Sequence, residues 1–334
     1  MAERLSHAAI QGGHDGMIVP EHFVPIPETI SPEAQAFLAH TAPVAAMPLP
    51  SSLDDHAAWH AYRSAGDKGV LALTRAYAET YPADVSTHPL SAACVYEITP
   101  RNLAQEHERH AIVFVHGGGW ITGGGDAAIY TAMHMAGLAR MRVFSVDYRM
   151  VPEVGFPAPV EDVLEAYRLV LARFHPECVA MYGPSAGANL VPAAVLLGRD
   201  RGVPMPAACA LHSCPSDITF SGDSVYTNYQ VDTVLRERDP GFGLYYSRGH
   251  DPRDPLLSPL HADFSKGFPP TILTSGTRDL LLSPTVLLHR ALRRAGIEAE
   301  LHVWEAMTHC PFFGAPEEDE FYREHVRFMR EHLR

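Results

Sequence analysis

Short apolar runs alternate with longer amphipathic stretches from about residue 85 to the end of the chain. The run at residues 111–115 carries no polar side chain, as expected for a strand that is buried on both faces of a parallel sheet. The apolar runs predict strands at residues 94–99, 111–116, 142–148, 178–182, 207–214, 271–276 and 299–305. The stretches between them predict helices at residues 126–140, 157–174, 185–198, 280–295 and 316–333. This alternation predicts an α/β fold in which helices cover both faces of a mostly parallel sheet.

Two segments do not follow the alternation. Residues 1–65 contain repeated prolines, with short helices expected at 31–40 and 53–64, and we predict an N-terminal cap arm there. More than fifty residues rich in Phe and Tyr separate the strand ending near 214 from the strand at 271. Loops of that length usually have a function, so we predict a cap insertion at about residues 217–250 within a main domain spanning 85–334. The alternative is that these aromatic side chains only pack a small core of the insertion itself.

The composition narrows the class of protein. The chain has 334 residues, of which 46% are hydrophobic, and this is enough for one large domain with a substantial core. Its net charge of −13 argues against nucleic-acid binding and against docking on anionic lipid. We expect no membrane span and no signal peptide, because no apolar run approaches the length required. The five cysteines are odd in number and scattered, which favours free thiols and a cytoplasmic location.

We expect no metal and no cofactor, because the histidines and cysteines do not follow the spacing of zinc ligands. The chemistry instead centres on Gly-Pro-Ser-Ala-Gly at residues 183–187, which lies between a predicted strand and a predicted helix. A serine on such a sharp turn has its hydroxyl exposed and can act as a nucleophile, so Ser185 is our candidate. Gly183 and Gly187 lack a Cβ atom and therefore let neighbouring segments approach the turn. The pattern also occurs by chance as an ordinary Ser/Gly turn, so its neighbours must support it.

A serine nucleophile needs a base, and the base needs an acid that orients it. Downstream of Ser185, Asp279 follows the predicted strand at 271–276, and His309 follows the strand at 299–305. This is the Ser, acid, His order of one large class of hydrolases, so we predict Asp279 as the acid and His309 as the base. Asp279 could instead only cap the helix that follows it. The weaker competitors are His302, which lies inside a strand, and three aspartates that precede their strand: Asp251, Asp254 and Asp263.

The segment His-Gly-Gly-Gly-Trp at residues 116–120 directly follows the strand at 111–116. Glycines at this position let backbone N–H groups turn toward a negatively charged oxygen. We therefore predict an oxyanion hole formed by the N–H groups of Gly118, Gly119 and Ala186. His116 and Gly117 are expected to support the loop. For the acyl or alcohol pocket the candidate residues are Trp120, Tyr226, Tyr229 and Tyr245.

From about residue 90 to the end, the chain resembles the hormone-sensitive-lipase-like branch of bacterial esterases in the α/β-hydrolase superfamily. The matching segments are HGGGW (116–120), DYRMVPE (147–153), FPAPVED (156–162), GPSAG (183–187) and DPLLSP (254–259), together with Asp279 and His309. The resemblance implies a mostly parallel eight-stranded sheet with a helical cap. It also implies a serine carboxylesterase that hydrolyses short to medium acyl esters through an acyl-enzyme. A homodimer through the edge of the strand at 299–305 is a further implication.

The chain departs from this family pattern at two places. Pro184 stands where the family usually has aspartate, and Leu281, Leu282 and Ser283 stand where it often has another acid. Lactone, arylamide and carbamate hydrolysis need the same three residues and stay open as alternatives. The run Gly-Thr-Arg-Asp-Leu-Leu-Leu-Ser at 276–283 also resembles a subgroup that includes lactone hydrolases.

Two other classes of protein are less consistent with the sequence. Gly123-Gly124-Gly125 opens a predicted helix, and Asp147 follows about twenty residues later, as in dinucleotide-binding proteins. That fingerprint should directly follow a strand, however, and here the segment 116–122 intervenes. A non-catalytic small-molecule-binding protein of the same fold would be expected to lack one of the three candidate residues, and none is missing. We therefore favour an enzyme that acts on a small ester.

Overall fold

The computed structural model describes residues 11–13, 16–18, 23–41, 47–235 and 241–334. The remaining residues, which belong to the predicted N-terminal arm and to the predicted insertion, lie outside the described part. The centre of the molecule is an eight-stranded sheet with the strand order β10-β9-β8-β7-β5-β6-β4-β3. Its strands are β3 (Ala83–Pro89), β4 (Cys94–Pro100), β5 (Ala111–Val115), β6 (Arg142–Asp147), β7 (Val179–Pro184), β8 (Ala208–His212), β9 (Thr271–Gly276) and β10 (Ala299–Trp304). Only β4 runs antiparallel to the other strands of this sheet, so the predicted fold class is confirmed.

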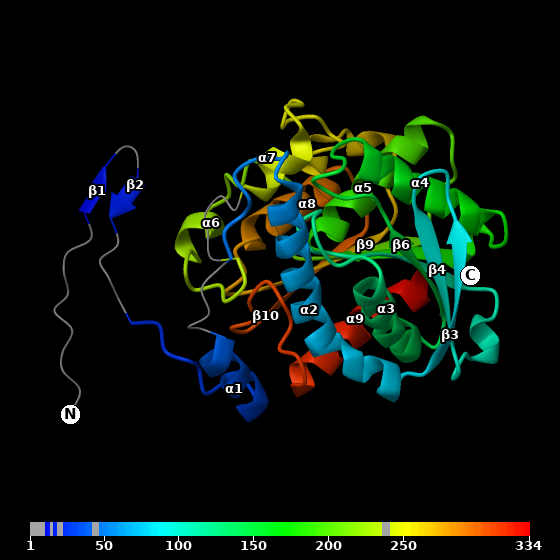
Figure 1. Ribbon diagram of the computed structural model, residues 1–334, viewed down its shortest axis with the longest axis horizontal. Helices are drawn as coiled ribbons and strands as arrows, with labels where there is room; N and C mark the ends of the chain where they lie inside the picture. Colours follow the sequence, from blue (N-terminus) through cyan, green and yellow to red (C-terminus); the bar gives the residue numbers. More distant parts are fainter. Residues whose placement is uncertain (1–10, 14–15, 19–22, 42–46, 236–240) are drawn as a thin grey trace.

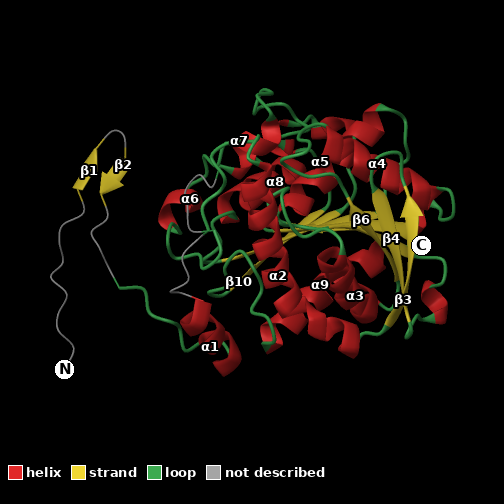
Figure 2. Ribbon diagram, viewed as in Figure 1, coloured by secondary structure: helices red, strands yellow, loops and turns green. Residues whose placement is uncertain are grey.

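Helices lie on both faces of the sheet (Figures 1 and 2). On one face lie α4 (Ala158–Leu171), α5 (Ala186–Asp200) and α8 (Leu282–Arg294), and on the other α3 (Asp126–Ala139) and α9 (Pro316–His332). Helix α2 (His56–Thr80) extends from the region of α7 to α3, against which it packs. Alternate residues of β5 enter the two apolar layers: Val113 packs with the first set of helices, and Ile112 and Phe114 pack with the second. Since strand side chains alternate between the faces, both faces of this strand must be apolar. This explains the uninterrupted hydrophobic run.

The N-terminal segments lie outside the central sheet and its covering helices. The strands β1 (Gln11–Gly13) and β2 (Gly16–Ile18) form an antiparallel hairpin that stands apart from the sheet in Figure 1. Helix α1 (Pro32–Thr41) begins where the sequence predicts, because the Ser31 hydroxyl accepts the N–H of Ala34 at 3.1 Å. The backbone N–H and the hydroxyl of Ser31 also donate to Glu317 at 2.7 Å each, which fixes α1 to the start of α9.

The helix expected at 53–64 is wrong in extent, since it is only the first part of the 25-residue α2. Gly66 and Gly69 lower the helix propensity of the sequence at its centre. Gly66 has a packing reason, because a Cβ there would lie 2.8 Å from the Cγ2 atom of Thr122. Helix α2 therefore continues without a break past the predicted arm boundary at residue 65, and the domain boundaries themselves stay a prediction.

Other elements were not expected from the hydrophobic pattern. Strand β3 is mostly exposed and polar, and its extended form depends on antiparallel pairing with β4. The insertion contains two short helices, α6 (Ser224–Thr227) and α7 (Phe242–Ser247). Four single turns of 3₁₀ helix occupy Gln105–His107, Pro176–Cys178, Pro259–His261 and Phe264–Lys266. Within the described ranges, no helix combines the length and the apolar character needed to cross a membrane.

Candidate active site

The turn between β7 and α5 holds Ser185 in a left-handed conformation with φ of 54°. Its N–H donates to the carbonyl of His212 at 2.8 Å, which ties the turn to the neighbouring strand β8. A Cβ at Gly183 would collide with the backbone of Gly187, and a Cβ at Gly187 would collide with the carbonyl of Val115. Both glycines are therefore required by close backbone approach around a strained serine, and such strain is typical of a functional turn.

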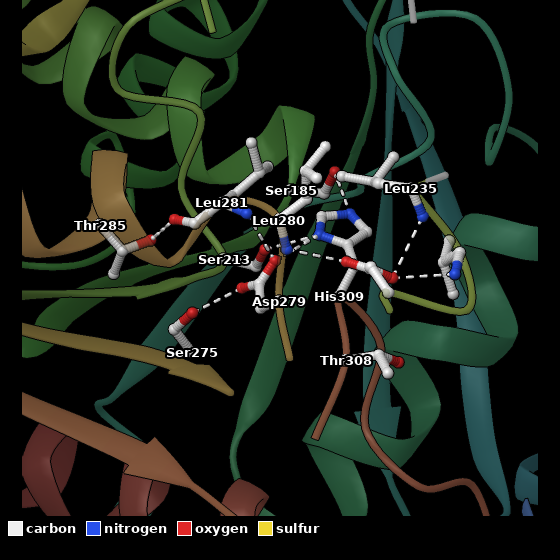
Figure 3. A network of polar contacts seen from close by, with 12 residues as sticks. Ser185, Ser213, Leu235, Ser275, Asp279, Leu280, Leu281, Thr285, Thr308 and His309 are labelled. Carbon is white, nitrogen blue, oxygen red and sulfur yellow. Dashed lines mark hydrogen bonds and ion pairs between the residues drawn. The ribbon is translucent and has the colours of Figure 1, made fainter. Parts of the chain in front are cut away.

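The structure brings the three residues predicted as a catalytic triad together (Figure 3). Nε2 of His309 lies 2.8 Å from Oγ of Ser185, and Nδ1 of His309 lies 3.5 Å from Oδ1 of Asp279. The side chain of Asp279 is fully buried, and that of His309 is 7% exposed. Strands β7, β9 and β10 are parallel, so the loops that follow them meet at the same edge of the sheet. The triad geometry thus follows from the strand order.

The environment pushes the pKa values of His309 and Asp279 apart. Burial alone would lower the pKa of His309, but the hydrogen bond and the charge of Asp279, assisted by Asp232, outweigh burial and raise it. Burial would raise the pKa of Asp279, but its interactions with His309, His212 and Ser275 outweigh burial and lower it. Asp279 is therefore ionised beside an imidazole that readily accepts a proton.

Two further contacts fix the carboxylate of Asp279. The hydroxyl of Ser275 donates to Oδ2 at 2.5 Å, and the N–H of Leu281 donates to Oδ1 at 2.8 Å. The Leu281 bond closes a short turn of the kind that an aspartate side chain forms with the backbone two residues on. The helix-capping alternative is not supported, because the N-cap of α8 is Leu281 and no side-chain bond caps this helix.

Sequence reasoning missed two residues at the end of β8. Oγ of Ser213 lies 2.5 Å from Nδ1 of His309, and Ser213 itself is buried with φ of 47°. Nε2 of His212 donates to the carbonyl of His309 at 2.9 Å, and burial lowers the pKa of His212 to about 4, so this imidazole is neutral near pH 7. Only a partial signal was available: both residues lie at the carboxyl end of the strand next to the elbow strand, where active-site groups meet, but the sequence does not say which side chains face His309.

The glycine-rich loop after β5 passes close to Ser185. Gly118 and Gly119 both have positive φ, at 107° and 62°, which other residues adopt only with strain. A Cβ at Gly117 would lie 3.0 Å from the carbonyl oxygen of Pro184 and 3.2 Å from Cβ of Ser185. Ser185 also stands directly before α5, whose N-terminus carries a partial positive charge. These features suit the stabilisation of a negatively charged oxygen.

His116 holds this loop from behind. Its Nδ1 donates to the carbonyl of Gly117 at 2.7 Å, and its ring stacks on Tyr148 with 4.1 Å between the ring centroids. The Tyr148 hydroxyl donates to the carbonyl of His116 at 3.0 Å. Burial is the main cause that lowers the pKa of His116, so the ring is held neutral. The arrangement fits an anchoring role.

Helix α2 clamps the other end of the loop. Arg63 donates to the carbonyls of Ile121 and Val151 at 2.9 and 2.6 Å and forms an ion pair with Glu153 at 2.6 Å. The Asp67 carboxylate accepts the N–H of Gly123 at 2.7 Å. The family segment at residues 147–153 thus braces the loop through a helix that the sequence placed only in part.

A cavity of about 700 Å³ opens in front of Ser185 and His309. One wall comes from the part of the chain predicted as an arm, with Met47, Pro48, Leu49 and Tyr62. Another part of the wall comes from the predicted insertion, with Phe220, Val234, Leu235 and Phe242. A further part, which the sequence did not predict, lies between the helices on the other side and is lined by Thr74, Tyr77, Thr131, Tyr182 and Tyr322.

Of the four predicted pocket residues, Trp120 lines this cavity, whereas Tyr226, Tyr229 and Tyr245 are not among the described residues that line it. Tyr226 is 60% exposed. The Tyr245 hydroxyl donates to the carbonyl of Pro50 at 2.7 Å, and its ring packs edge-on against Trp59. Tyr245 therefore joins the insertion to the N-terminal segments instead of facing a substrate.

The strand order and the elbow define an α/β hydrolase. A family model described as alpha/beta hydrolase fold matches residues 112–313, and the chain belongs to this family. The acetyl-hydrolase of Streptomyces hygroscopicus is 34% identical over 200 residues, which cover 59% of this chain and 67% of the relative. Carboxylic ester hydrolase LipN of Mycobacterium tuberculosis is 34% identical over 213 residues, and the match covers 59% of this chain and just over half, 56%, of LipN.

Solved structures give the same result over a longer range. The crystal structure of esterase E25 matches with a TM-score of 0.85 and 32% identity, covering 96% of this chain and all of that chain. An esterase from the bacterial hormone-sensitive lipase family matches with a TM-score of 0.78 and 29% identity, covering 91% and 99% of the two chains. The predicted resemblance to this branch is confirmed, as is the predicted enzyme class, a carboxylic ester hydrolase.

Proposed function

We propose that this α/β hydrolase is a serine carboxylesterase that cleaves short to medium acyl esters by way of an acyl-enzyme. The observation that carries the proposal is the 2.8 Å contact between Nε2 of His309 and Oγ of Ser185, with the buried Asp279 on the far side of the ring. A serine hydroxyl becomes a useful nucleophile only when a base within this distance takes its proton.

In the first half-reaction, Oγ of Ser185 attacks the ester carbonyl while Nε2 of His309 takes the hydroxyl proton. The resulting imidazolium is stabilised by the negative charge of Asp279. His309 then gives the proton to the alkoxide of the leaving alcohol, and the acyl group stays on Ser185. In the second half-reaction, water attacks this acyl-enzyme with His309 again as the base, and the carboxylic acid leaves.

Each tetrahedral intermediate carries a negatively charged oxygen. The N–H groups of Gly118, Gly119 and Ala186 are proposed as its donors, since the first two belong to the glycine-rich loop that passes Ser185 and the third begins α5. Donors that are already in place need no reorganisation during the reaction and commonly contribute about 3 kcal/mol each to the transition state.

The substrate class follows from the cavity and from the relatives. A cavity of about 700 Å³ with walls from the cap segments suits a small ester better than a long triglyceride. The name acetyl-hydrolase of one relative agrees with a short acyl group, and the name carboxylic ester hydrolase of another agrees with an ester substrate. Lactones, arylamides and carbamates can react by the same chemistry, so they are measured as alternative substrates beside the esters.

The proposal is tested with p-nitrophenyl esters from acetate to palmitate, beside a γ-lactone, an anilide and a carbamate. We expect the highest kcat/KM at an acyl chain of about eight carbons or fewer, and a loss of about a million-fold in kcat in Ser185→Ala. Ser221→Ala, which alters another serine near the cap, is the matched control and should keep its rate. Faster turnover of the lactone or the anilide than of every ester would overturn the substrate class.

A further inference from the structure

Asp232 is a fully buried carboxylate in the insertion, between α6 and α7. Its Oδ1 accepts the N–H groups of Val234 and Leu235 at 2.8 and 3.1 Å, and its Oδ2 accepts the N–H of Leu280 at 2.9 Å. Leu280 is the residue next to Asp279, and it is also fully buried. One side chain of the insertion thus holds the backbone of the loop that carries the candidate catalytic acid.

The other two partners of Asp232 belong to the cavity. Val234 and Leu235 both line the space in front of Ser185. The same carboxylate therefore fixes part of the cavity wall with one oxygen and the acid loop with the other. A second contact reinforces this junction, because the side-chain amide of Asn228 donates to the carbonyl of Asp279 at 2.8 Å. The position of the insertion and the position of Asp279 are coupled through these bonds.

The charge of Asp232 acts on the same site. Among the described residues, three titratable groups interact with it: Asp279, His309 and Cys310. Burial and then the charge of Asp279 raise the pKa of Asp232 to about 6, while His309 acts in the opposite direction. The Cys310 thiol stays neutral because burial, followed by the charge of Asp232, raises its pKa to about 12. Near neutral pH, two carboxylates therefore act on His309, and Oδ1 of Asp279 lies 3.5 Å from its Nδ1.

A buried carboxylate is costly unless hydrogen bonds or charged partners compensate. Here three backbone N–H groups supply the hydrogen bonds, and these bonds lie between the cavity wall and the acid loop. We propose that Asp232 is a positioning residue for ester hydrolysis: it holds the Asp279 loop against the cap insertion and adds a second negative charge beside the imidazolium of His309. This proposal rests on the function proposed above.

The test compares Asp232→Asn and Asp232→Glu with the wild-type chain, using kcat, KM and the pH dependence of kcat/KM on a short p-nitrophenyl ester. Asn removes the charge and one of the two acceptor oxygens. The acid limb of the Asn variant should move to lower pH by about half a unit or more, because the protonated His309 loses a nearby negative charge. Its kcat should fall about tenfold or more, since the acid loop loses an anchor. Glu keeps the charge, so its acid limb should stay near that of wild type while kcat falls.

Asp217→Asn is the matched control. Asp217 is another buried aspartate of the insertion, and it accepts hydrogen bonds only from Thr219 and Ser221 among the bonds described for it. The control should leave the acid limb unchanged. An Asp232→Asn enzyme with wild-type kcat and an unmoved acid limb would overturn the proposal, as would an Asp217→Asn enzyme with the same shift.

A measurement on the wild-type protein covers the case in which the Asp232 variants do not fold. The Leu280 amide should exchange its hydrogen slowly at pH 7, because it is buried and bonded to a carboxylate. Fast exchange of this amide would overturn the proposal that Asp232 holds the Asp279 loop. A wild-type protein that hydrolyses no ester would defeat the proposed function instead, and the exchange experiment would still decide whether Asp232 holds the loop.

Discussion

Oγ of Ser213 lies 2.5 Å from Nδ1 of His309, closer than Oδ1 of Asp279 at 3.5 Å. As the proposed base for Ser185, His309 needs a free Nε2, so the ring proton must sit on Nδ1. Nδ1–H then donates to the Ser213 oxygen, and Oδ1 of Asp279 lies 3.5 Å from the same nitrogen. The two neighbours have separate effects: the charge of Asp279 selects this tautomer, and the hydroxyl of Ser213 fixes the orientation of the ring.

The first prediction concerns the tautomer. Asp279→Asn should lower kcat by about 10,000-fold, because an amide can donate to Nδ1 and leave the proton on Nε2. Steady-state hydrolysis of p-nitrophenyl butyrate measures this. Asp263→Asn, on an exposed turn before β9, is the control and should stay within about twofold of wild type. An Asp279→Asn enzyme with more than a tenth of wild-type kcat would contradict the assignment.

The second prediction separates the Ser213 hydroxyl from the Ser213 backbone. Ser213→Ala and Ser213→Gly should both lower kcat about tenfold with little change in KM, since both remove the same contact to His309. The Gly variant should be the more stable of the two by about 1 kcal/mol, because φ is 47° at this position. Thermal unfolding and kinetics measure the two effects. Full activity in either variant would show that the Ser213 hydroxyl does not orient His309 for catalysis.

The third prediction concerns pH. The pKa of His309 is raised above the ordinary value of 6.5, against the effect of burial, by Asp279 and Asp232. The base works only when neutral, so the rate should fall as the pH drops through this raised pKa. The acid limb of kcat/KM should therefore have its midpoint above 6.5. A midpoint clearly below 6.5 would show that the carboxylates do not raise the basicity of His309.

The parts of the fold and site that depend on residues close together in the sequence could be predicted, whereas those that depend on contacts between distant residues could not. The strands, the elbow and the glycine loop follow from local rules, namely apolar runs and residues with special backbone demands. Asp279 and His309 follow from chain order. Ser213, His212 and Asp232 could not be identified in the same way, because their roles come from contacts between strands or loops that are distant in the sequence.

The same reasoning explains the fold elements that were missed. Strand β3 is polar, and only its pairing with β4 makes it a strand. The three tyrosines of the predicted pocket were selected because they are aromatic and lie in a long insertion. Tyr245, however, packs against Trp59 and donates a hydrogen bond to the carbonyl of Pro50. Aromatic content alone does not distinguish a cavity wall from a packing contact.

The fourth prediction tests close packing at the elbow. Gly187→Ala should fail to fold or lose more than about 3 kcal/mol of stability, because its Cβ would collide with the carbonyl of Val115. Gly69→Ala in α2 is the opposite control. A Cβ there meets nothing within 4 Å, so this helical position should gain about 0.5–1 kcal/mol. Chemical denaturation of both variants checks the pair, and a stable, active Gly187→Ala protein would contradict the packing.

The fifth prediction concerns assembly. Strand β10 forms one edge of the sheet and is partly exposed, with Val303 at 42%. A homodimer through this edge should give about twice the chain mass of 36.6 kDa by size exclusion with light scattering. Val303→Lys should shift the protein to the monomer, since charged residues protect edge strands from pairing. A wild-type protein with the mass of a single chain would contradict the predicted homodimer.

The most direct test of the central claim is to trap the nucleophile. Wild-type protein is incubated with a p-nitrophenyl alkylphosphonate, and the adduct is located by peptide mass mapping. We expect the wild-type protein to release one equivalent of p-nitrophenol, to carry one adduct, on Ser185, and to lose ester hydrolysis. We expect no adduct in Ser185→Ala. An adduct on another residue, or ester hydrolysis that survives in Ser185→Ala, would contradict the account.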